Sequence, residues 1–390
     1  MATFSKATFD AASYLAFRPS YPQWLYEEIL AFHRLGRRKA SASSSTAGPA
    51  PESVIPFFRS AWDLGCGPGI SSLPLQPKFD HVTGLEPSAN MVANAIRLDS
   101  SILPSSSSSG SSESNHPRLR TLTPALRRAL LGDAANPIQK LGSINYIQGH
   151  AEDLAKHCPP ASADLIVAGQ AAHWFNYEKL WPALARSIAP GGTVAFWGYA
   201  EFSLPDFPQS APLISAFMSD PNTMSAEAKA LTEKEDFQGG ITNVGAFFER
   251  PGRSILDRGL VDLPWPWQVE GAVNSPDANL DRWDRSSATR TLHSVVGLPS
   301  SSWNPAWPPV DRASDEAGQT MDLVVDWNGL EKYLRTASAV ANFLHQHPND
   351  ADQYAGRDVV QRFIRQLRTI IPADELRLRW PVSLLMLKAK

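Results

Sequence analysis

The first half of the chain alternates short apolar runs with amphipathic stretches. The apolar runs predict β-strands and the stretches between them predict α-helices. Strands that alternate with helices indicate a parallel sheet with right-handed crossovers, so we expect an α/β fold. Strands are expected at 59–64, 81–86, 143–148, 163–168 and 193–199, and helices at 71–76, 88–98 and 177–188.

The pattern is less regular outside this region. Residues 201–320 are rich in Pro, Trp, Ser and Asp and have no clean period. We expect them to cover the carboxyl ends of the strands, where ligands bind in open α/β sheets. Further helices are predicted at 22–32, 331–346 and 357–370, and a closing strand at 376–387, in which Pro381 favours an edge position or a break.

Four segments follow from this pattern. They are an N-terminal helix and loop (1–58), a core (59–200), a cap (201–330), and C-terminal helices with a closing strand of the core (331–390). Two Ser-rich stretches, 40–52 and 100–118, cannot bury apolar surface, and we expect them to be dispensable surface loops. Another helix is expected within 119–142, before the sheet resumes.

Composition excludes several classes of protein. The 390 residues carry a formal net charge of −3, and no run of Lys and Arg suggests a nucleic-acid surface. No window is apolar enough to span a membrane, and the first residues lack an apolar signal core. The two cysteines, Cys66 and Cys158, have no metal-type spacing. We therefore expect a cytoplasmic protein, a monomer or homodimer, without a metal site.

A glycine-rich turn follows the first predicted strand. Asp63-Leu64-Gly65-Cys66-Gly67-Pro68-Gly69 stands between strand and helix, where glycines let the backbone approach a cofactor. Its spacing matches the G-x-G-x-x-G dinucleotide fingerprint only imperfectly. It is similar instead to motif I of the class I S-adenosylmethionine (SAM) methyltransferases, although such a triplet is also found in ordinary turns.

An acid ends the second predicted strand, about 20 residues after the glycine turn. Glu86 is therefore the natural ligand for the two ribose hydroxyls of an adenosine cofactor, since dinucleotide-binding folds place an acid there. A solvated strand end is the alternative. Pro87 and Ser88 then open the next helix, and Met91 in its first turn either packs against the adenine or belongs to the core.

Several further motifs share one order with a known family. They are Phe9-Asp10 with Tyr14, Arg18-Pro19-Ser20-Tyr21-Pro22, Ala172-His173-Trp174-Phe175, Phe196-Trp197-Gly198-Tyr199, and Phe248-Glu249-Arg250-Pro251-Gly252-Arg253-Ser254. With the glycine turn they resemble the fungal trans-aconitate methyltransferase-like proteins. The resemblance covers residues 4–260 and weakens beyond. At Ala337 the family tends to carry Trp, which implies a larger or differently shaped acceptor pocket here.

The resemblance implies a Rossmann-like, seven-stranded, mostly parallel sheet with a cap after the fifth strand, and SAM as cofactor. It implies that Arg18 pairs with the SAM carboxylate, although Arg18 can instead cap the first helix. Glu152 or Asp153 would accept from the adenine amine, the other being a helix cap. The implied cofactor-binding residues are Tyr14, Arg18, Asp63, Gly65, Cys66, Gly67, Gly69, Glu86, Pro87, Met91, Ala151, Glu152 and Gln170.

The acceptor site is expected beyond the fourth and fifth strands and in the cap. His173 is a candidate base or a structural histidine, and Trp174, Trp197 and Tyr199 can line the site or fill the core. Arg250 and Arg253 can clamp carboxylates or lie on the surface. We therefore expect O-methylation of a small carboxylate. Methylation of a hydroxyl or nitrogen, a SAM-binding regulator without activity, and a nicotinamide oxidoreductase are alternatives.

Overall fold

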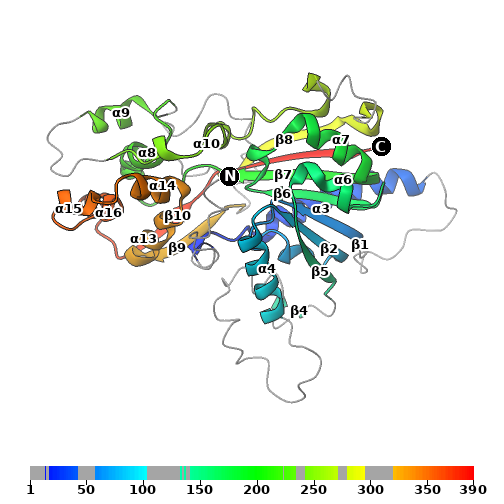
Figure 1. Ribbon diagram of the computed structural model, residues 1–390, viewed down its shortest axis with the longest axis horizontal. Helices are drawn as coiled ribbons and strands as arrows, with labels where there is room; N and C mark the ends of the chain where they lie inside the picture. The colour runs from blue at the N-terminus through cyan, green and yellow to red at the C-terminus, as the bar shows by residue number, and fades with distance from the viewer. Residues whose placement is uncertain are drawn as a thin grey trace, which may run out of the picture. The chain divides into compact units, whose positions relative to one another are not determined.

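A seven-stranded sheet organises the chain (Figure 1). The computed structural model describes Tyr14 and residues 17–42, 58–102, 132–133, 136–137, 141–222, 224–233, 242–270, 279–294 and 319–390. The strand order is β5-β2-β1-β6-β7-β11-β8. Their bounds are β1 Phe58–Leu64, β2 Phe79–Glu86, β5 Ser143–Gln148, β6 Ala163–Gly169, β7 Ile188–Tyr199, β8 Trp283–His293 and β11 Val382–Ala389.

The central strands run parallel, as the alternating pattern predicts. β5 pairs with β2, β2 with β1, β1 with β6, and β6 with β7, all in parallel register. Every residue of β6 is buried, which is typical of a strand covered on both faces. Parallel neighbours bring their carboxyl ends to one edge, so Leu64, Glu86 and Gly169 end close together in the sheet. The predicted Rossmann-like α/β fold is confirmed.

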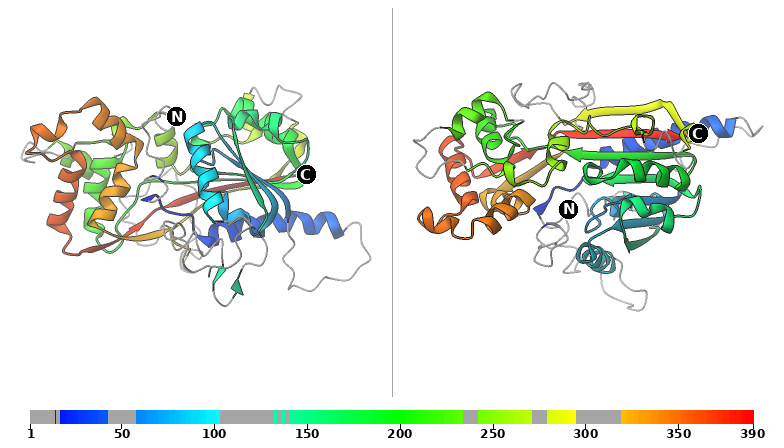
Figure 2. Two further views of the ribbon diagram at one scale, coloured as in Figure 1. Left: turned by 60° about the horizontal axis from the view of Figure 1, so that its bottom comes forward. Right: turned by 45° about the horizontal axis from the view of Figure 1, so that its top comes forward.

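Helices lie beside the strands of this sheet (Figure 2). α4 (Ala89–Ile102) packs against β2 and β5, and α6 (Leu154–His157) packs against α7 (Tyr177–Ser187). α3 (Gln23–Ala42) extends well beyond the predicted 22–32. The helix predicted at 71–76 is only a 3-10 turn, Leu73–Leu75. Pro74 and Pro77 explain this difference, because proline lacks a backbone N–H and restricts the residue before it.

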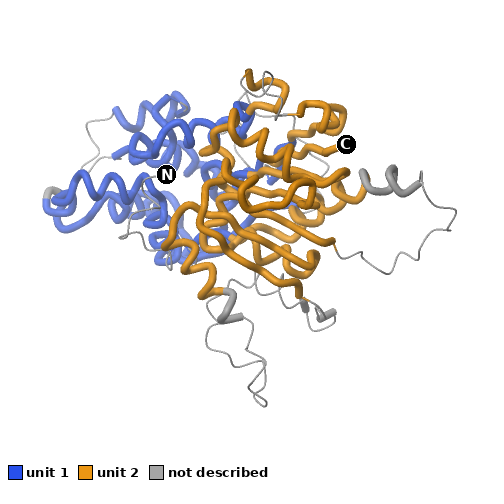
Figure 3. Tube along the Cα trace, turned by 45° about the vertical axis from the view of Figure 1, so that its right-hand side comes forward, with its two compact units in different colours: residues 1–19, 198–263, 291–383 blue, residues 20–197, 264–290, 384–390 orange. Residues whose placement is uncertain are grey.

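The described chain groups into two compact units (Figure 3). The first, here the cap unit, comprises residues 1–19, 198–263 and 291–383, and the second, the sheet unit, comprises 20–197, 264–290 and 384–390. The sequence pattern predicted no strand between 201 and 330, yet two strands lie there: β9 (Asp322–Asp326), and β8, which joins the sheet. Most residues of β8 are half-buried or exposed, so the alternation that would have revealed it is weak.

The cap unit is mainly helical. It contains α8 (Ala211–Met218), α9 (Ala226–Thr232), α10 (Gly252–Asp257), α13 (Trp327–Arg335), α14 (Ser338–Gln346), α15 (Asp350–Gln353) and α16 (Val359–Ile370). An antiparallel pair, β9 (Asp322–Asp326) with β10 (Glu375–Arg379), accompanies them. Phe217 of α8 stacks on Phe363 of α16 with ring centroids 4.0 Å apart. The predicted closing strand is divided at Trp380-Pro381 into β10 and β11, where Pro381 indicated a break.

Some of the segments named from the sequence lie outside the described residues. These are Phe9-Asp10, positions 43–52 and 103–118 of the two Ser-rich stretches, and most of the expected helix within 119–142. Only two short strands of that last segment are described, β3 (Gly132–Asp133) and β4 (Asn136–Pro137), which pair with each other. The expectation that the Ser-rich stretches are dispensable stays a prediction.

A buried carboxylate fixes the turn that follows β1. Asp63 is fully buried, and one of its oxygens accepts hydrogen bonds from the hydroxyls of Ser71 at 2.7 Å and Ser72 at 2.6 Å. Tyr26 of α3 donates to the Ser71 carbonyl at 3.2 Å. Burial raises the pKa of Asp63 to about 7, although the two hydroxyls oppose this shift. The Asp63 carboxyl therefore changes protonation near neutral pH.

This pKa predicts a pH dependence of stability. The folded protein holds the Asp63 proton more tightly than the unfolded chain, so its contribution is present below about pH 4 and is lost as the pH rises through 7. We expect Asp63→Asn to remove a component on the order of a few kcal/mol from the pH dependence of the unfolding free energy. Urea denaturation of both proteins between pH 5 and pH 8 measures it. Identical pH profiles would contradict the assignment.

Candidate functional site

The turn after β1 presents open backbone. Gly65, Gly67 and Gly69 all have positive φ, at 66°, 55° and 93°. A Cβ on Gly65 would lie 2.6 Å from the Cβ of Ala171, and one on Gly69 would lie 2.6 Å from the Tyr146 hydroxyl. A Cβ on Gly67 would have nothing within 4 Å. Two of these glycines are therefore needed for packing, and the third faces space that a ligand can occupy.

Glu86 connects this turn to the end of β2. Its two carboxylate oxygens accept from the backbone N–H groups of Gly67 at 3.0 Å and Ser88 at 2.9 Å. Glu86 is 5% exposed, and burial raises its pKa, although the two backbone N–H groups oppose this. A carboxylate has about four lone-pair sites, so two remain for other donors. The predicted ribose ligand therefore lies directly beside the open glycine.

Of the predicted cofactor-binding residues near Glu86, some are buried in the core and one is half-buried. Cys66 is buried with Tyr146, Val92 and Ala95, and burial raises the pKa of its thiol well above the usual range. Met91 is also buried, and its N–H donates to the Ser88 hydroxyl at 3.4 Å, as a capping serine would require. Pro87 is half-buried. The side chain of Cys66 thus belongs to the core, and only its backbone belongs to the turn.

The segment after β5 lies in the same unit. Ala151 is buried at the start of a 3-10 turn, Ala151–Asp153. Glu152 accepts from the backbone N–H of Asn176 at 2.7 Å, and Asp153 forms an ion pair with Lys156 at 2.7 Å. Of the two acids proposed for the adenine amine, both have partners in the protein. Glu152 also joins this turn to the residue that caps α7.

The residues after β6 adopt a strained, compact turn. Gln170 has a φ of 56°, and its N–H donates to the Trp197 carbonyl at 2.8 Å. His173 is 6% exposed, and its ring lies 4.8 Å from that of Trp174, which is half-buried. Trp197 is fully buried between the edges of Tyr21 and Tyr26, so it packs in the core.

In the cap unit, aromatic rings surround Arg18. Its guanidinium donates to the Tyr199 hydroxyl at 3.2 Å and to the Thr336 carbonyl at 3.0 Å. It lies 5.0 Å from the ring centroid of Tyr14 and 5.5 Å from that of Tyr333. Within the described residues, Arg18 has no carboxylate partner and its Nε atom has no hydrogen bond. This leaves a half-buried cation that an anion can neutralise.

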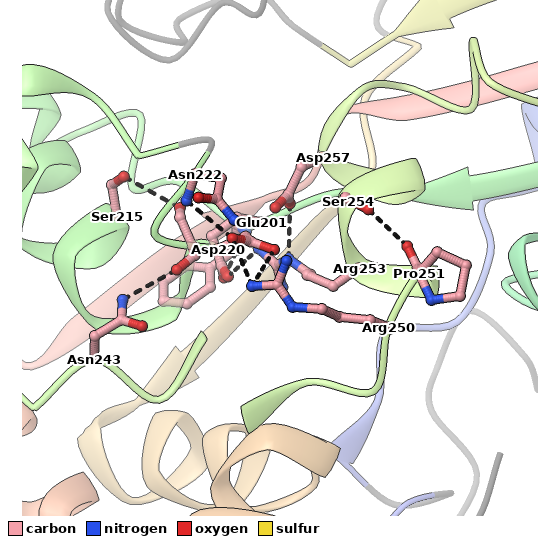
Figure 4. A network of polar contacts seen from close by, with 12 residues as sticks. Glu201, Ser215, Asp220, Asn222, Asn243, Arg250, Pro251, Arg253, Ser254 and Asp257 are labelled. Carbon is pink, nitrogen blue, oxygen red and sulfur yellow. Dashed lines mark hydrogen bonds and ion pairs between the residues drawn. The ribbon is translucent and has the colours of Figure 1, made fainter. Parts of the chain in front are cut away.

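The other two predicted arginines have partners in the protein (Figure 4). Arg253 is 8% exposed and pairs with Glu201 at 3.0 Å and with Asp257, one helical turn away, at 2.7 Å. Arg250 pairs with Asp220 at 3.0 Å while about half of its side chain stays exposed. The guanidinium of Arg253 is thus neutralised by two carboxylates, and burial raises the pKa of Glu201.

Sequence reasoning missed these partners. Glu201 and Asp220 stand 30 residues or more from the arginines they bind, and no local pattern pairs them. Ser71 and Ser72 were interpreted only as a helix start, although two hydroxyls soon after a buried acid were an available signal. Among the described residues, no three His, Cys, Asp or Glu side chains are grouped to hold a metal, and no helix is long and apolar enough to cross a membrane.

Comparisons with known proteins point to one chemistry. The family model described as a methyltransferase domain matches residues 123–196. A Saccharomyces cerevisiae protein, "Probable S-adenosylmethionine-dependent methyltransferase CRG1", is 27% identical over 208 residues, covering 53% of this chain and 52% of the relative. A Dictyostelium discoideum protein named for methyltransferase activity is 22% identical over 203 residues, covering 52% of each chain. The chain thus spans about half the length of the curated relatives it matches.

Solved structures give a weaker likeness. A structure described as a type II methyltransferase from Anaeromyxobacter dehalogenans is 20% identical, with a TM-score of 0.46, over 95% of this chain and 97% of the other. The matched domain contains β5, β6 and most of β7, which are parallel strands of the sheet. This part of the chain is thus similar to a methyltransferase domain, and about half of the chain is similar to two relatives named as methyltransferases, one of them SAM-dependent.

Proposed function

We propose that the protein transfers a methyl group from SAM to a small molecule. The observation that carries this proposal is the pairing of Gly67 with Glu86. The backbone at Gly67 faces open space, and the Gly67 N–H donates to the Glu86 carboxylate and so holds that carboxylate beside the same space. Backbone approach and a fixed acid are what an adenosine cofactor with a polar tail requires. The two relatives support the chemistry through the activity in their names.

The residues of the sheet unit fit SAM. Glu86 retains acceptor capacity for ribose hydroxyls, and Gly67 leaves room for the amino-acid tail. When bound, SAM supplies an electrophilic methyl group on a sulfonium cation. The chain's own contribution is to orient the cofactor and the acceptor, and such positioning supplies roughly 7–11 kcal/mol of a barrier in favourable cases. The half-buried ring of Trp174 offers a π face for a cation.

The acceptor class depends on which cation is available. A carboxylate acceptor needs no base because it is ionised at pH 7, but it needs a positive partner. Arg253 is neutralised by two carboxylates and Arg250 has one carboxylate partner, Asp220, while half of its side chain stays exposed. Arg18 has no carboxylate partner among the described residues. We therefore propose O-methylation of a carboxylate, as the trans-aconitate-like resemblance implies, with Arg18 and Arg250 as the groups that pair with ligand carboxylates.

A second candidate is O-methylation of a hydroxyl. Such an acceptor usually requires a general base, and His173 stands immediately beyond β6, largely buried beside Trp174. The buried histidine is the observation that favours this alternative. Ala337 directly follows Thr336, whose carbonyl accepts a hydrogen bond from Arg18. The family that this chain resembles tends to carry Trp at this position, so the side chain here is smaller.

The cofactor site is tested first by Gly67→Val. The valine Cβ would enter the space that the cofactor needs, so we expect SAM affinity to fall below detection in calorimetry. Gly356→Val is the matched control, because Gly356 also has a positive φ, 75°, and open surroundings. We expect the control to keep its SAM affinity. Equal SAM affinity in both variants would contradict the assigned site.

Glu86 is tested by comparing Glu86→Ala with the wild type. Hydrogen bonds to a charged group contribute about 1.5–3 kcal/mol, so we expect SAM to bind roughly 10- to 150-fold more weakly. Circular dichroism and thermal melting show whether the variant still folds. A folded variant with unchanged SAM affinity would mean that the ribose is held by other residues.

The acceptor class is tested with labelled SAM against a panel of polycarboxylates and phenols. For a carboxylate acceptor, we expect Arg18→Ala to weaken binding of the carboxylate ligand by about 2–5 kcal/mol. The half-exposed Arg250→Ala should weaken it by about 1 kcal/mol or less, and His173→Ala should change kcat modestly. Arg253→Ala should act mainly on stability. A loss of about 10²–10⁴ in kcat for His173→Ala, with both arginine variants unaffected, would instead establish the hydroxyl acceptor.

A further inference from the structure

A cavity of about 580 Å³ lies within the cap unit, apart from every residue assigned above to the cofactor or acceptor. It is formed by α13, by the turn at 355–357 and by one face of α16. Its size is that of sites for small molecules, which usually measure about 300–1,000 Å³. The side chains that decide its chemistry are Trp327, Glu331, Arg357, Ile364, Arg365 and Arg368.

The charge of this cavity is strongly positive. Arg357, Arg365 and Arg368 line it, all three are exposed, and none forms an ion pair with another described residue. Glu331 also lines it, but its carboxylate is held at 2.7 Å by Arg335. Arg335 also binds Asp358 at 2.8 Å. The neighbouring acids are therefore already paired, and three guanidinium groups are left without an anion.

The floor of the cavity is fixed and partly apolar. Trp327 is buried, and its ring N–H donates to the Ala373 carbonyl at 2.8 Å, which holds the indole in one orientation. Arg368 lies 4.9 Å from the ring centroid of Trp327, and Ile364 is 8% exposed beside it. Stacking on an aromatic ring limits the freedom of a guanidinium, so less entropy is lost when it binds a ligand.

The backbone brings the third arginine to this floor. Ala355 and Gly356 both have positive φ, 54° and 75°, immediately before Arg357. The left-handed conformation is costly for alanine and rarely occurs without a structural requirement. Here it reverses the chain between α15 and the Asp358 cap of α16 and places Arg357 at the same cavity as Arg365 and Arg368.

We propose that this cavity binds a small polyanion, with phosphate groups as the preferred ligand chemistry. Arginine presents a planar fork that matches phosphate and carboxylate oxygens. Three unpaired guanidinium groups match a multiply charged ligand better than a single carboxylate. A phosphate chain concentrates more charge than a tricarboxylate of similar size, which is why phosphate is favoured. The site does not depend on the proposed methyl transfer, because no residue assigned to that reaction lines it.

The test uses the full-length protein and inorganic tripolyphosphate, which carries no adenosine and cannot mimic SAM. Calorimetry should show one tripolyphosphate bound per chain, with citrate at least 10-fold weaker. Arg357→Ala, Arg365→Ala and Arg368→Ala should each weaken tripolyphosphate binding at least 10-fold. The matched control is Arg285→Ala, because Arg285 is also exposed and lies 5.1 Å from the Trp267 ring centroid, in the other unit. The control should bind like the wild type.

Each outcome decides the proposal. Equal weakening by Arg285→Ala and the three cavity variants would mean that net charge alone attracts the anion, and would overturn it. No binding of either anion to the wild type would overturn it as well. Citrate binding more tightly than tripolyphosphate, with the same dependence on the three arginines, would keep the site and overturn the preference for phosphate. SAM affinity, measured in the same way, should be unchanged in all four variants. Anion binding and SAM binding can then succeed or fail separately, so the two proposals are tested independently.

Discussion

The hydrogen bonds of Glu86 are the constraint on which the candidate site depends. One carboxylate, at the end of β2, accepts from Gly67 in the turn after β1 and from Ser88 at the start of the next helix. Both bonds run to backbone N–H groups, so the one side chain of Glu86 fixes the path of the chain at two places. The Gly65 N–H adds a bond to the Leu85 carbonyl at 2.7 Å. The end of one strand therefore shapes the ligand-binding turn of its neighbour.

Asp63 also holds the glycine turn in place through its side-chain hydrogen bonds. It is fully buried and accepts from two serines beyond the glycines, so the turn is held at both of its ends. Two buried acids on adjacent strands raise each other's cost of ionisation, and Glu86 is indeed one cause of the raised pKa of Asp63. The cost of ionising two buried acids accompanies a backbone arrangement that both acids fix and that leaves the space beside Gly67 open.

The sequence predicts features whose signals are local. The parallel strands, the glycine spacing and the acid at the end of the second strand could all be predicted, since each depends on residues close together in the chain. β8 could not, because its weak burial leaves little alternation between apolar and polar positions. The ion pairs of Arg253 with Glu201 and Arg250 with Asp220 could not either, since tertiary packing alone brings those residues together. Trp197 could have been a lining or a core residue, and only its neighbours Tyr21 and Tyr26 identify it as core.

The open turn beside Glu86 is the proposed site for an adenosine cofactor of the SAM type. The most direct measurement is a calorimetric titration of the full-length protein with S-adenosylhomocysteine and, separately, with NAD. We expect one equivalent of S-adenosylhomocysteine to bind per chain and NAD to produce no heat of binding. Binding of NAD without binding of S-adenosylhomocysteine would contradict it.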